Sequence, residues 1–163
     1  LRIDENDEAL DELDLSLVKE NIKNYDAVII SDYCKGYLSE RVMREISEMH
    51  DLVFLDTKKL LGDWCDKMTY IKINYYEHAR TKHLIKKDLY NQLIITLGSK
   101  GCEHKRKIYP VNKVEIKDSS GAGDTFIAGL VANYLENKDI GEAIHFANQC
   151  ATKVVQKRGV SIV

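Results

Sequence analysis

The sequence has little of the features that mark specialised classes of protein. It contains one proline in 163 residues, and no proline-, glycine- or serine-rich stretch that would indicate a linker between domains. No apolar run approaches the roughly 20 residues that span a bilayer, and no signal peptide opens the sequence. The formal net charge is only −2, whereas nucleic-acid-binding domains are usually strongly basic. We therefore expect a cytoplasmic protein that spans no membrane and binds no nucleic acid.

Disulfide and zinc frameworks are not expected either, because the cysteines are few and scattered. Cys34, Cys65, Cys102 and Cys150 form no CxxC pair and have no histidines clustered with them. This spacing favours the reduced thiols of a cytosolic protein over a disulfide or zinc scaffold. With 44% apolar and 31% charged residues, the composition is that of an ordinary globular domain.

Strand-like and helix-like patterns alternate along the chain. Short apolar runs predict strands at 26–31, 52–55, 69–73 and 92–97, an extended pair within 107–117 around Pro110, and a last strand at 161–163. Helical patterns predict a helix that ends near Asn24, a second at 40–49 capped by Ser39, a third through 126–136, and a fourth that starts at Asp139, with Glu142 as its capping-box partner and Gly159 as its C-cap. The alternation predicts an α/β fold, in which helices cover both faces of a mostly parallel sheet.

Four of the predicted strands end in polar residues or glycine. These ends are 32–33, 56–58, Asn74 and 98–99. In open parallel sheets, ligands bind beyond the carboxyl ends of the strands, so four such ends would form one polar cleft. Polar loops after strands are common, and a single end would carry no such prediction. The four together, beside a glycine-rich segment, favour a binding site.

That glycine-rich segment, residues 118–125, reads Asp-Ser-Ser-Gly-Ala-Gly-Asp-Thr and runs directly into an apolar helical pattern. Glycines let a phosphate approach the backbone closely, and the unpaired N–H groups of a helix start bind anions. Asp124 would then lie beside the phosphate, where a carboxylate can hold and deprotonate an attacking hydroxyl. The arrangement predicts phosphoryl transfer from a nucleotide to an alcohol.

Two common nucleotide-binding motifs are missing, and a different pattern is present. Neither a P-loop nor a GxGxxG fingerprint occurs. Instead, residues 118–129 closely resemble the second signature of the PfkB family, the ribokinase-like carbohydrate kinases. The resemblance implies a three-layer α/β fold, an anion hole formed by Gly121, Ala122 and Gly123, and Asp124 as the catalytic base. A glycine-softened helix start with a favourable aspartate is the alternative explanation.

A second resemblance to that family concerns the ATP site. Residues 74–77, Asn-Tyr-Tyr-Glu, match the NxxE motif, which in the family supports the triphosphate through water and magnesium. The resemblance implies ATP and Mg²⁺ as cofactors, allows a monovalent cation, and assigns a water-mediated Mg²⁺ contact to Glu77. The ATP-binding residues that it implies are Asn74, Tyr75, Tyr76, Glu77, Thr96, Gly98, Ser99, Gly101 and Asn148.

Each part of this ATP site also has a purely structural explanation. Asn74 and Glu77 are the residues that would cap a helix. Residues 96–101 are compatible with an ordinary strand–turn–strand hairpin, and Asn148 with a polar position on an amphipathic helix. Ile73 stands where the family usually has proline, a departure that concerns the turn rather than the chemistry.

Within the family, the sequence is most similar to kinases of D-glycero-β-D-manno-heptose 7-phosphate. Residues 31–38, Ser-Asp-Tyr-Cys-Lys-Gly-Tyr-Leu, resemble a segment of those enzymes. Further similar segments are 2–5, 56–58 and 157–163. The resemblance implies phosphorylation of the anomeric hydroxyl in ADP-heptose and lipopolysaccharide precursor synthesis, and it makes Asp32, Lys35 and Lys58 candidate substrate residues. Another sugar, nucleoside or vitamin kinase of the family, or a nucleotide-binding module without activity, are the alternatives.

The resemblance covers only part of a kinase of this family. Members are substantially longer, and their N-terminal half carries the first glycine-rich signature, most sugar contacts and a small β-sheet lid, none of which is recognisable here. We therefore expect residues 1–163 to be a partial domain, the ATP-binding and catalytic half. Some heptose enzymes continue into a nucleotidyltransferase domain, and because the lid often supports dimerisation, the resemblance allows a homodimer of the full-length protein.

Overall fold

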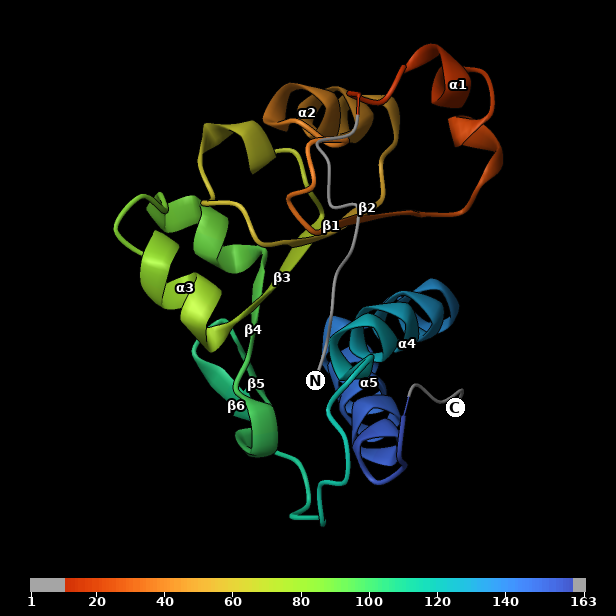
Figure 1. The fold of residues 1–163 in the computed structure, drawn as a ribbon. Coiled ribbons are helices and arrows are strands. Elements are labelled where there is room, and N and C mark those ends of the chain that lie inside the picture. The colour runs from red at the N-terminus through yellow and green to blue at the C-terminus, as the bar shows by residue number, and fades with distance from the viewer. Residues whose placement is uncertain (1–10, 160–163) are drawn as a thin grey trace.

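The computed structural model describes residues 11–159, which contain a six-stranded sheet (Figure 1). The strands follow one another in space as they do in the sequence. Their bounds are β1 Val28–Asp32, β2 Val53–Thr57, β3 Tyr70–Asn74, β4 Leu93–Thr96, β5 Cys102–His104 and β6 Lys107–Tyr109. Strands β1 to β4 are parallel, and β5 and β6 extend the sheet as antiparallel strands. This mostly parallel sheet confirms the predicted fold class.

Helices cover both faces of the sheet, as predicted. Figure 1 shows α4 and α5 packed side by side on one face, with α2 and α3 on the other. The α-helices are α1 Ser16–Lys19, α2 Glu40–Met49, α3 Tyr75–Thr81, α4 Ala122–Asn137 and α5 Ile140–Val155, and the 3₁₀ helices are η1 Ile22–Asn24, η2 Asp63–Cys65, η3 Lys87–Asn91 and η4 Gly98–Lys100.

The sheet separates two hydrophobic cores. Successive side chains of a strand point to opposite faces, and β2 shows this directly. Val53 and Leu55 belong to the core beneath α2, whereas Phe54 between them packs in the core beneath α4 and α5. All three side chains are fully buried, which explains why this strand reads as a continuous apolar run rather than an alternating one.

Local sequence signals placed the starts of two helices correctly. The Ser39 hydroxyl accepts a hydrogen bond from the Val42 N–H at 3.2 Å and caps α2. The Asp139 carboxylate likewise accepts from the Glu142 N–H at 3.0 Å and caps α5, which is one half of the predicted capping box. Such side-chain caps satisfy N–H groups that have no partner inside the helix.

Two predicted features in the second half of the chain differ from the structure. The extended pair within 107–117 is wrong, because β6 pairs with β5 across a turn in which Lys105 and Arg106 have positive φ. Pro110 directly follows β6, and its missing N–H ends the ladder there. Gly159 has the left-handed conformation expected of it, but the C-cap of α5 is Gln156.

The N-terminal helix is also shorter than the sequence suggested. Between residue 11 and Asn24 the structure has only the single turns α1 and η1. The segment 2–5 and the predicted strand at 161–163 lie outside the described residues.

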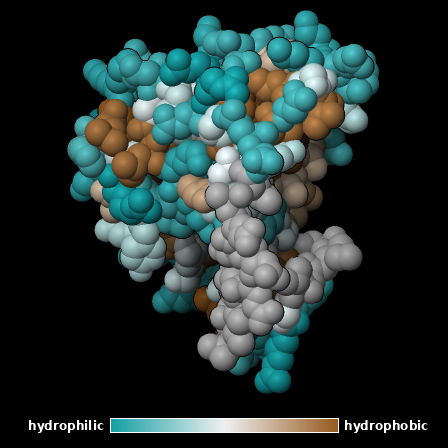
Figure 2. Space-filling view, turned by 45° about the horizontal axis from the view of Figure 1, so that its top comes forward, coloured by the Kyte–Doolittle hydropathy of each residue, from teal (hydrophilic) through white to brown (hydrophobic). Residues whose placement is uncertain are grey.

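The surface is mixed in polarity, and the thiols are unpaired. The face seen in Figure 2 is mostly hydrophilic, with separate hydrophobic patches. Within residues 11–159, no helix has the length and apolarity needed to cross a bilayer. All four cysteines are unpaired, and only Cys34 is exposed.

A buried histidine makes the stability of this fold depend on pH. His104 in β5 is 3% exposed, and its Nδ1 lies 2.7 Å from the Leu93 carbonyl oxygen. Its Nε2 is buried, and within residues 11–159 it has no hydrogen-bond partner. Burial lowers the pKa of His104 below its ordinary value of 6.5. Below that value the unfolded chain gains a proton that the folded state does not yet accept, so the free energy of unfolding should fall as the pH decreases below about 6.5.

Urea unfolding at pH 7.5 and pH 5.5 would measure this dependence. His104→Gln, which cannot titrate, should lose less stability between the two pH values than the wild type. The matched control is His83→Gln at an exposed position, which should behave as the wild type does. An unchanged pH dependence in His104→Gln would contradict the assignment. Burial also lowers the pKa of His78, so part of the dependence should remain.

Candidate active site

The carboxyl ends of β1 to β4 lie along one edge of the sheet. Asp32 pairs with Thr57 across β1 and β2, and Asn74 pairs with Thr96 across β3 and β4. These polar positions were noted separately in the sequence, and parallel pairing brings them to a common edge. Ligands of open parallel sheets bind at such an edge.

The first turn of α4 contacts the same edge of the sheet. The Tyr33 hydroxyl, just after β1, donates a hydrogen bond to Oδ1 of Asp124 at 2.7 Å. Gly123 lies against Lys72 of β3, because a methyl group at Gly123 would be 3.0 Å from the Lys72 Nζ. The structure therefore brings Asp124 and the strand ends together.

Backbone N–H groups at this helix start are free to bind an anion. Gly121, the N-cap, has φ of 76°, a left-handed conformation that suits glycine. Ala122 N–H donates to the Ser119 carbonyl at 3.2 Å. Within residues 11–159, no acceptor is recorded for the N–H groups of Gly121, Gly123 and Asp124. The sequence predicted an anion hole formed by the N–H groups of Gly121, Ala122 and Gly123. In the structure the Ala122 N–H already has an acceptor, whereas the Asp124 N–H has none recorded within residues 11–159.

A buried ion pair lies next to this turn. Lys72 Nζ is 2.7 Å from Oδ2 of Asp56, and both side chains are largely buried. Burial raises the pKa of Asp56 above its ordinary value, Lys72 opposes the rise, and the negative charges of Glu77 and Asp124 add to it. Lys72 was not among the predicted site residues. Its place inside an apolar strand, two residues before Asn74, could have indicated a buried charge near the site.

Asp32, the first substrate candidate, has its carboxylate engaged within the protein. It is 5% exposed. Its Oδ1 accepts from the Cys34 N–H at 3.0 Å, and its Oδ2 accepts from the Thr57 hydroxyl at 2.8 Å and lies 3.2 Å from the Lys59 Nζ. The geometry therefore favours a structural role, in which Asp32 holds the loop after β1 against the end of β2.

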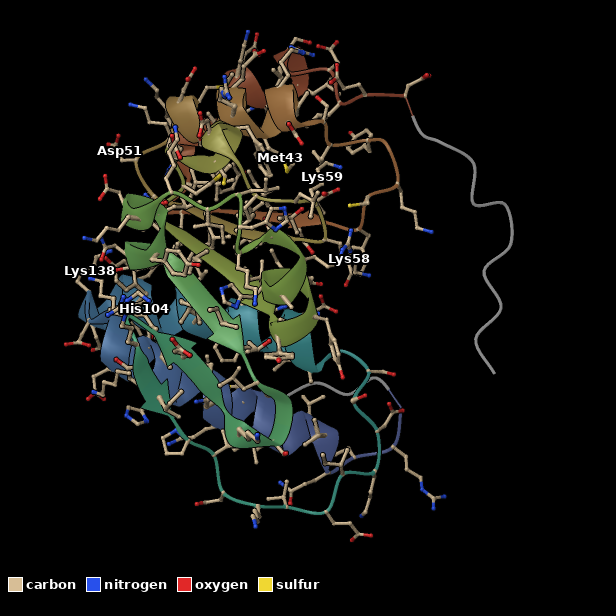
Figure 3. All side chains as sticks on the ribbon, turned by 90° about the vertical axis from the view of Figure 1, so that its left-hand side faces the viewer. Met43, Asp51, Lys58, Lys59, His104 and Lys138 are labelled. Carbon is tan, nitrogen blue, oxygen red and sulfur yellow. The ribbon has the colours of Figure 1, made fainter. Side chains whose placement is uncertain are left out.

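The two lysine candidates lie near this loop. Lys58 Nζ lies 4.4 Å from the centroid of the Tyr33 ring, a cation–π contact at the mouth of the site. Figure 3 shows Lys58 and Lys59 on the same side of the molecule, far from His104. Lys35 is exposed on the loop after β1.

The NxxE segment forms a complete capping box at the start of α3. Asn74 Oδ1 accepts from the Glu77 N–H at 2.9 Å, and Glu77 Oε2 accepts from the Asn74 N–H at 2.7 Å. Tyr75 and Tyr76 are exposed, and their rings meet edge to face at 5.7 Å. Asn74 and Glu77 therefore cap α3, which is the structural explanation that the sequence offered for them. The same hydrogen bonds hold both side chains at the end of β3.

A cavity of about 210 Å³ lies beside the first turn of α4. Several predicted ATP residues line it, together with apolar side chains that the sequence did not single out. The predicted residues in its wall are Thr96, Gly98, Ser99, Gly101, Ala122, Gly123 and Asn148. The apolar side chains are Val111, Val114, Ile116, Phe126, Ala151 and Val155. Small-molecule sites are mostly apolar pockets with a few placed polar groups, and this cavity fits that description.

Two residues of this cavity shape the wall itself. Gly101 has φ of 88°, and a methyl group there would lie 2.0 Å from the Tyr109 carbonyl oxygen, so only glycine fits. Asn148 is buried in α5, and its amide nitrogen donates to that same carbonyl at 3.0 Å. Asn148 thus ties α5 to the end of β6.

The oxygen donors near the anion hole fit a magnesium ion that is held mostly by phosphate and water. Within residues 11–159, no group of three or more His, Cys, Asp or Glu side chains could hold a metal ion by itself. Mg²⁺ retains several waters and usually takes one or two carboxylates together with substrate phosphates. Glu77 uses Oε2 in its capping box, and for Oε1 no protein partner is recorded in that part of the chain.

A protein-family model matches nearly the whole chain. Residues 3–163 match the model described as pfkB family carbohydrate kinase. The chain belongs to this family. HldE bifunctional proteins are similar curated relatives, with 34% identity to that of Campylobacter curvus over 87% of this chain and 30% to that of Helicobacter acinonychis over 91%. The chain spans only 35% and 37% of those two relatives.

Solved structures of the ribokinase family share the fold. Arabidopsis thaliana ribokinase, complexed with ribose and ATP, superposes with a TM-score of 0.69 at 19% identity, over 93% of this chain and 56% of that one. Thermotoga maritima ribokinase gives a TM-score of 0.68 at 20% identity, over 91% and 55% of the two chains. At these identities, the similarity establishes the ribokinase-like architecture.

Proposed function

We propose that this chain is the nucleotide-binding and catalytic part of an ATP-dependent sugar kinase that phosphorylates the anomeric hydroxyl of heptose 7-phosphate. The observation that carries the proposal is the α4 N-terminus, where free N–H groups, Asp124 and the strand ends converge beside an apolar cavity. The HldE relatives favour a heptose substrate over other sugars. The reaction would then supply ADP-heptose and lipopolysaccharide precursors in the cytoplasm.

Each part of the site would contribute to phosphoryl transfer. The nucleotide base would occupy the apolar cavity, and the transferring phosphate would accept from the N–H groups of Gly121, Gly123 and Asp124. These donors are fixed before the reaction, so they would stabilise the developing phosphoryl charge without reorganisation. A fixed donor of this kind typically contributes about 10²–10³ in rate.

Asp124 would act as the base. The substrate hydroxyl oxygen would bond to the γ-phosphorus while the bond from that phosphorus to the ADP oxygen breaks, and the hydroxyl proton would pass to Asp124. In the largely dissociative transition state the proton is transferred late, so the carboxylate mainly orients the hydroxyl. Mg²⁺, when bound near Glu77, would neutralise phosphate charge.

Substrate recognition would involve cations near the loop after β1. Lys58, at the mouth of the site, and Lys35 on the loop are candidates for contacting the 7-phosphate. Most of the remaining sugar contacts, and any dimer interface, would come from parts of the full-length protein that this chain does not include.

A substrate panel would test this function. We expect coupled ADP release by the full-length protein to show its highest kcat/KM with heptose 7-phosphate, and phosphorus NMR to show a second phosphate on the anomeric oxygen. Ribose, fructose 6-phosphate, adenosine and unphosphorylated heptose would be the comparison substrates. A higher kcat/KM with any of these would contradict the heptose assignment, although it would leave the kinase assignment intact.

A further inference from the structure

We propose that Tyr33 is a positioning residue that holds the Asp124 carboxylate in its catalytic orientation. Its hydroxyl donates to Oδ1 of Asp124 at 2.7 Å, and for Oδ2 no protein partner is recorded within residues 11–159. Tyr33 therefore occupies one oxygen and leaves the other for the acceptor hydroxyl. This inference rests on the proposed role of Asp124 as the base.

A comparison of two helix starts in this chain shows why the orientation has to be controlled. Glu77 and Asp124 both occupy the third position of a helix, α3 and α4. An acidic residue at this position readily folds back onto the N–H of the N-cap residue. Glu77 does so in α3, whereas Asp124 bonds to Tyr33 instead.

The difference matters for the anion hole. If Asp124 folded back as Glu77 does, its carboxylate would accept from the Gly121 N–H. The base would then be turned away from the substrate, and it would compete with phosphate for a donor of the helix start. The bond to Tyr33 keeps the carboxylate outward and leaves the Gly121 N–H for phosphate.

The Tyr33 side chain is 44% exposed, so packing alone does not fix the position of its ring. Its neighbour Asp32 is held by the Cys34 N–H, the Thr57 hydroxyl and Lys59. Cys34 also has φ of 59°, so the chain turns sharply just after Tyr33. This anchored turn directs the ring toward Asp124 in the first turn of α4.

Lys58 holds the ring from another direction. Its ammonium lies 4.4 Å from the centroid of the Tyr33 ring. Tyr33 is thus linked both to a candidate phosphate-binding lysine and to the base. Substrate binding at Lys58 would act on the same ring that orients Asp124.

Two measurements on Tyr33→Phe would test the proposal. The first is the carboxyl ¹³C chemical shift of Asp124 at pH 7.5 in the full-length protein labelled at aspartate, with the resonance assigned by Asp124→Asn. Loss of a hydrogen-bond donor changes the surroundings of the carboxylate, so this resonance should move while those of the other aspartates stay in place. The second is the kinetics of the variant, in which kcat should fall about tenfold while KM for ATP changes less than twofold.

Tyr37→Phe is the matched control, because it removes a hydroxyl from an exposed tyrosine on the same loop. It should leave both the Asp124 resonance and the kinetics as in the wild type. An unchanged Asp124 resonance in Tyr33→Phe would overturn the proposal, as would a kcat within a factor of two of the wild type.

The ¹³C measurement needs no turnover, so the two hypotheses can fail separately. A shifted Asp124 resonance in a protein that phosphorylates no member of the panel would support the Tyr33 contact and refute the proposed function. Turnover of heptose 7-phosphate with an unaltered Asp124 resonance in Tyr33→Phe would refute only the inference about Tyr33.

Discussion

Asp124→Asn should lower kcat of the full-length protein by about 10²–10⁴-fold, the usual contribution of a positioned general base. The amide keeps the size of the side chain, but it cannot take the proton of the acceptor hydroxyl. KM for ATP should change little, because the N–H groups of Gly121, Gly123 and residue 124 remain. Coupled ADP release with heptose 7-phosphate would measure the loss, and thermal unfolding would show that the fold is retained.

The control for this experiment is Asp63→Asn. Asp63 is an exposed aspartate that pairs with Lys86 at 2.6 Å on the surface, away from the site. This variant should keep wild-type kcat. If Asp124→Asn turned over within a factor of three of the wild type, Asp124 would not be the base.

Lys72→Met should destabilise the protein by about 3–5 kcal/mol at pH 7, because it leaves the Asp56 carboxylate buried without its partner. Breaking a buried ion pair on one side is costly, since the remaining charge keeps its desolvation penalty. Urea unfolding would measure the change. The surface control is Lys86→Met, which breaks an exposed ion pair with Asp63 and should have little effect.

The pH dependence of Lys72→Met follows from the pKa of Asp56. Burial already raises that pKa in the folded state, and losing Lys72 raises it further. The folded state then binds the proton more tightly than the unfolded state, so the destabilisation should be smaller at pH 5 than at pH 7. The double variant Asp56→Asn with Lys72→Met should recover much of the lost stability. Equal destabilisation at both pH values would contradict this explanation.

The sequence best predicted the features that depend on residues close together in the chain, such as helix caps and helix starts. Ser39 and Asp139 cap the helices that follow them because each side chain reaches an N–H three residues away. The glycine-rich segment likewise marked the start of α4, since Gly121 takes its left-handed conformation within a single turn. Strands β1 to β4 were recognised because both faces of this sheet are covered, which makes their residues apolar in succession.

Interactions between residues far apart in the chain could not be predicted from the sequence. Tyr33 and Asp124 are 91 positions apart, and nothing in either local pattern indicates their hydrogen bond. The sequence did not indicate the ion pair between Lys72 and Asp56, although a lysine inside an apolar strand suggests a buried partner. The extended pair predicted within 107–117 failed for a related reason, because β6 pairs backward with β5 and Pro110 ends the ladder.

By itself, the sequence determined the class of fold, the positions of β1 to β4 and of helices α2, α4 and α5, and the segment at which α4 begins. Those depend on hydrophobic periodicity and on caps and turns, which act over a few residues. Only the tertiary structure decided what each polar side chain does there. It engages the Asp32 carboxylate within the protein, uses one oxygen of Glu77 in a capping box, and turns Asp124 toward Tyr33. Parallel pairing gathers strand ends that are far apart in the chain, and the packing of the first turn of α4 against that edge adds Asp124.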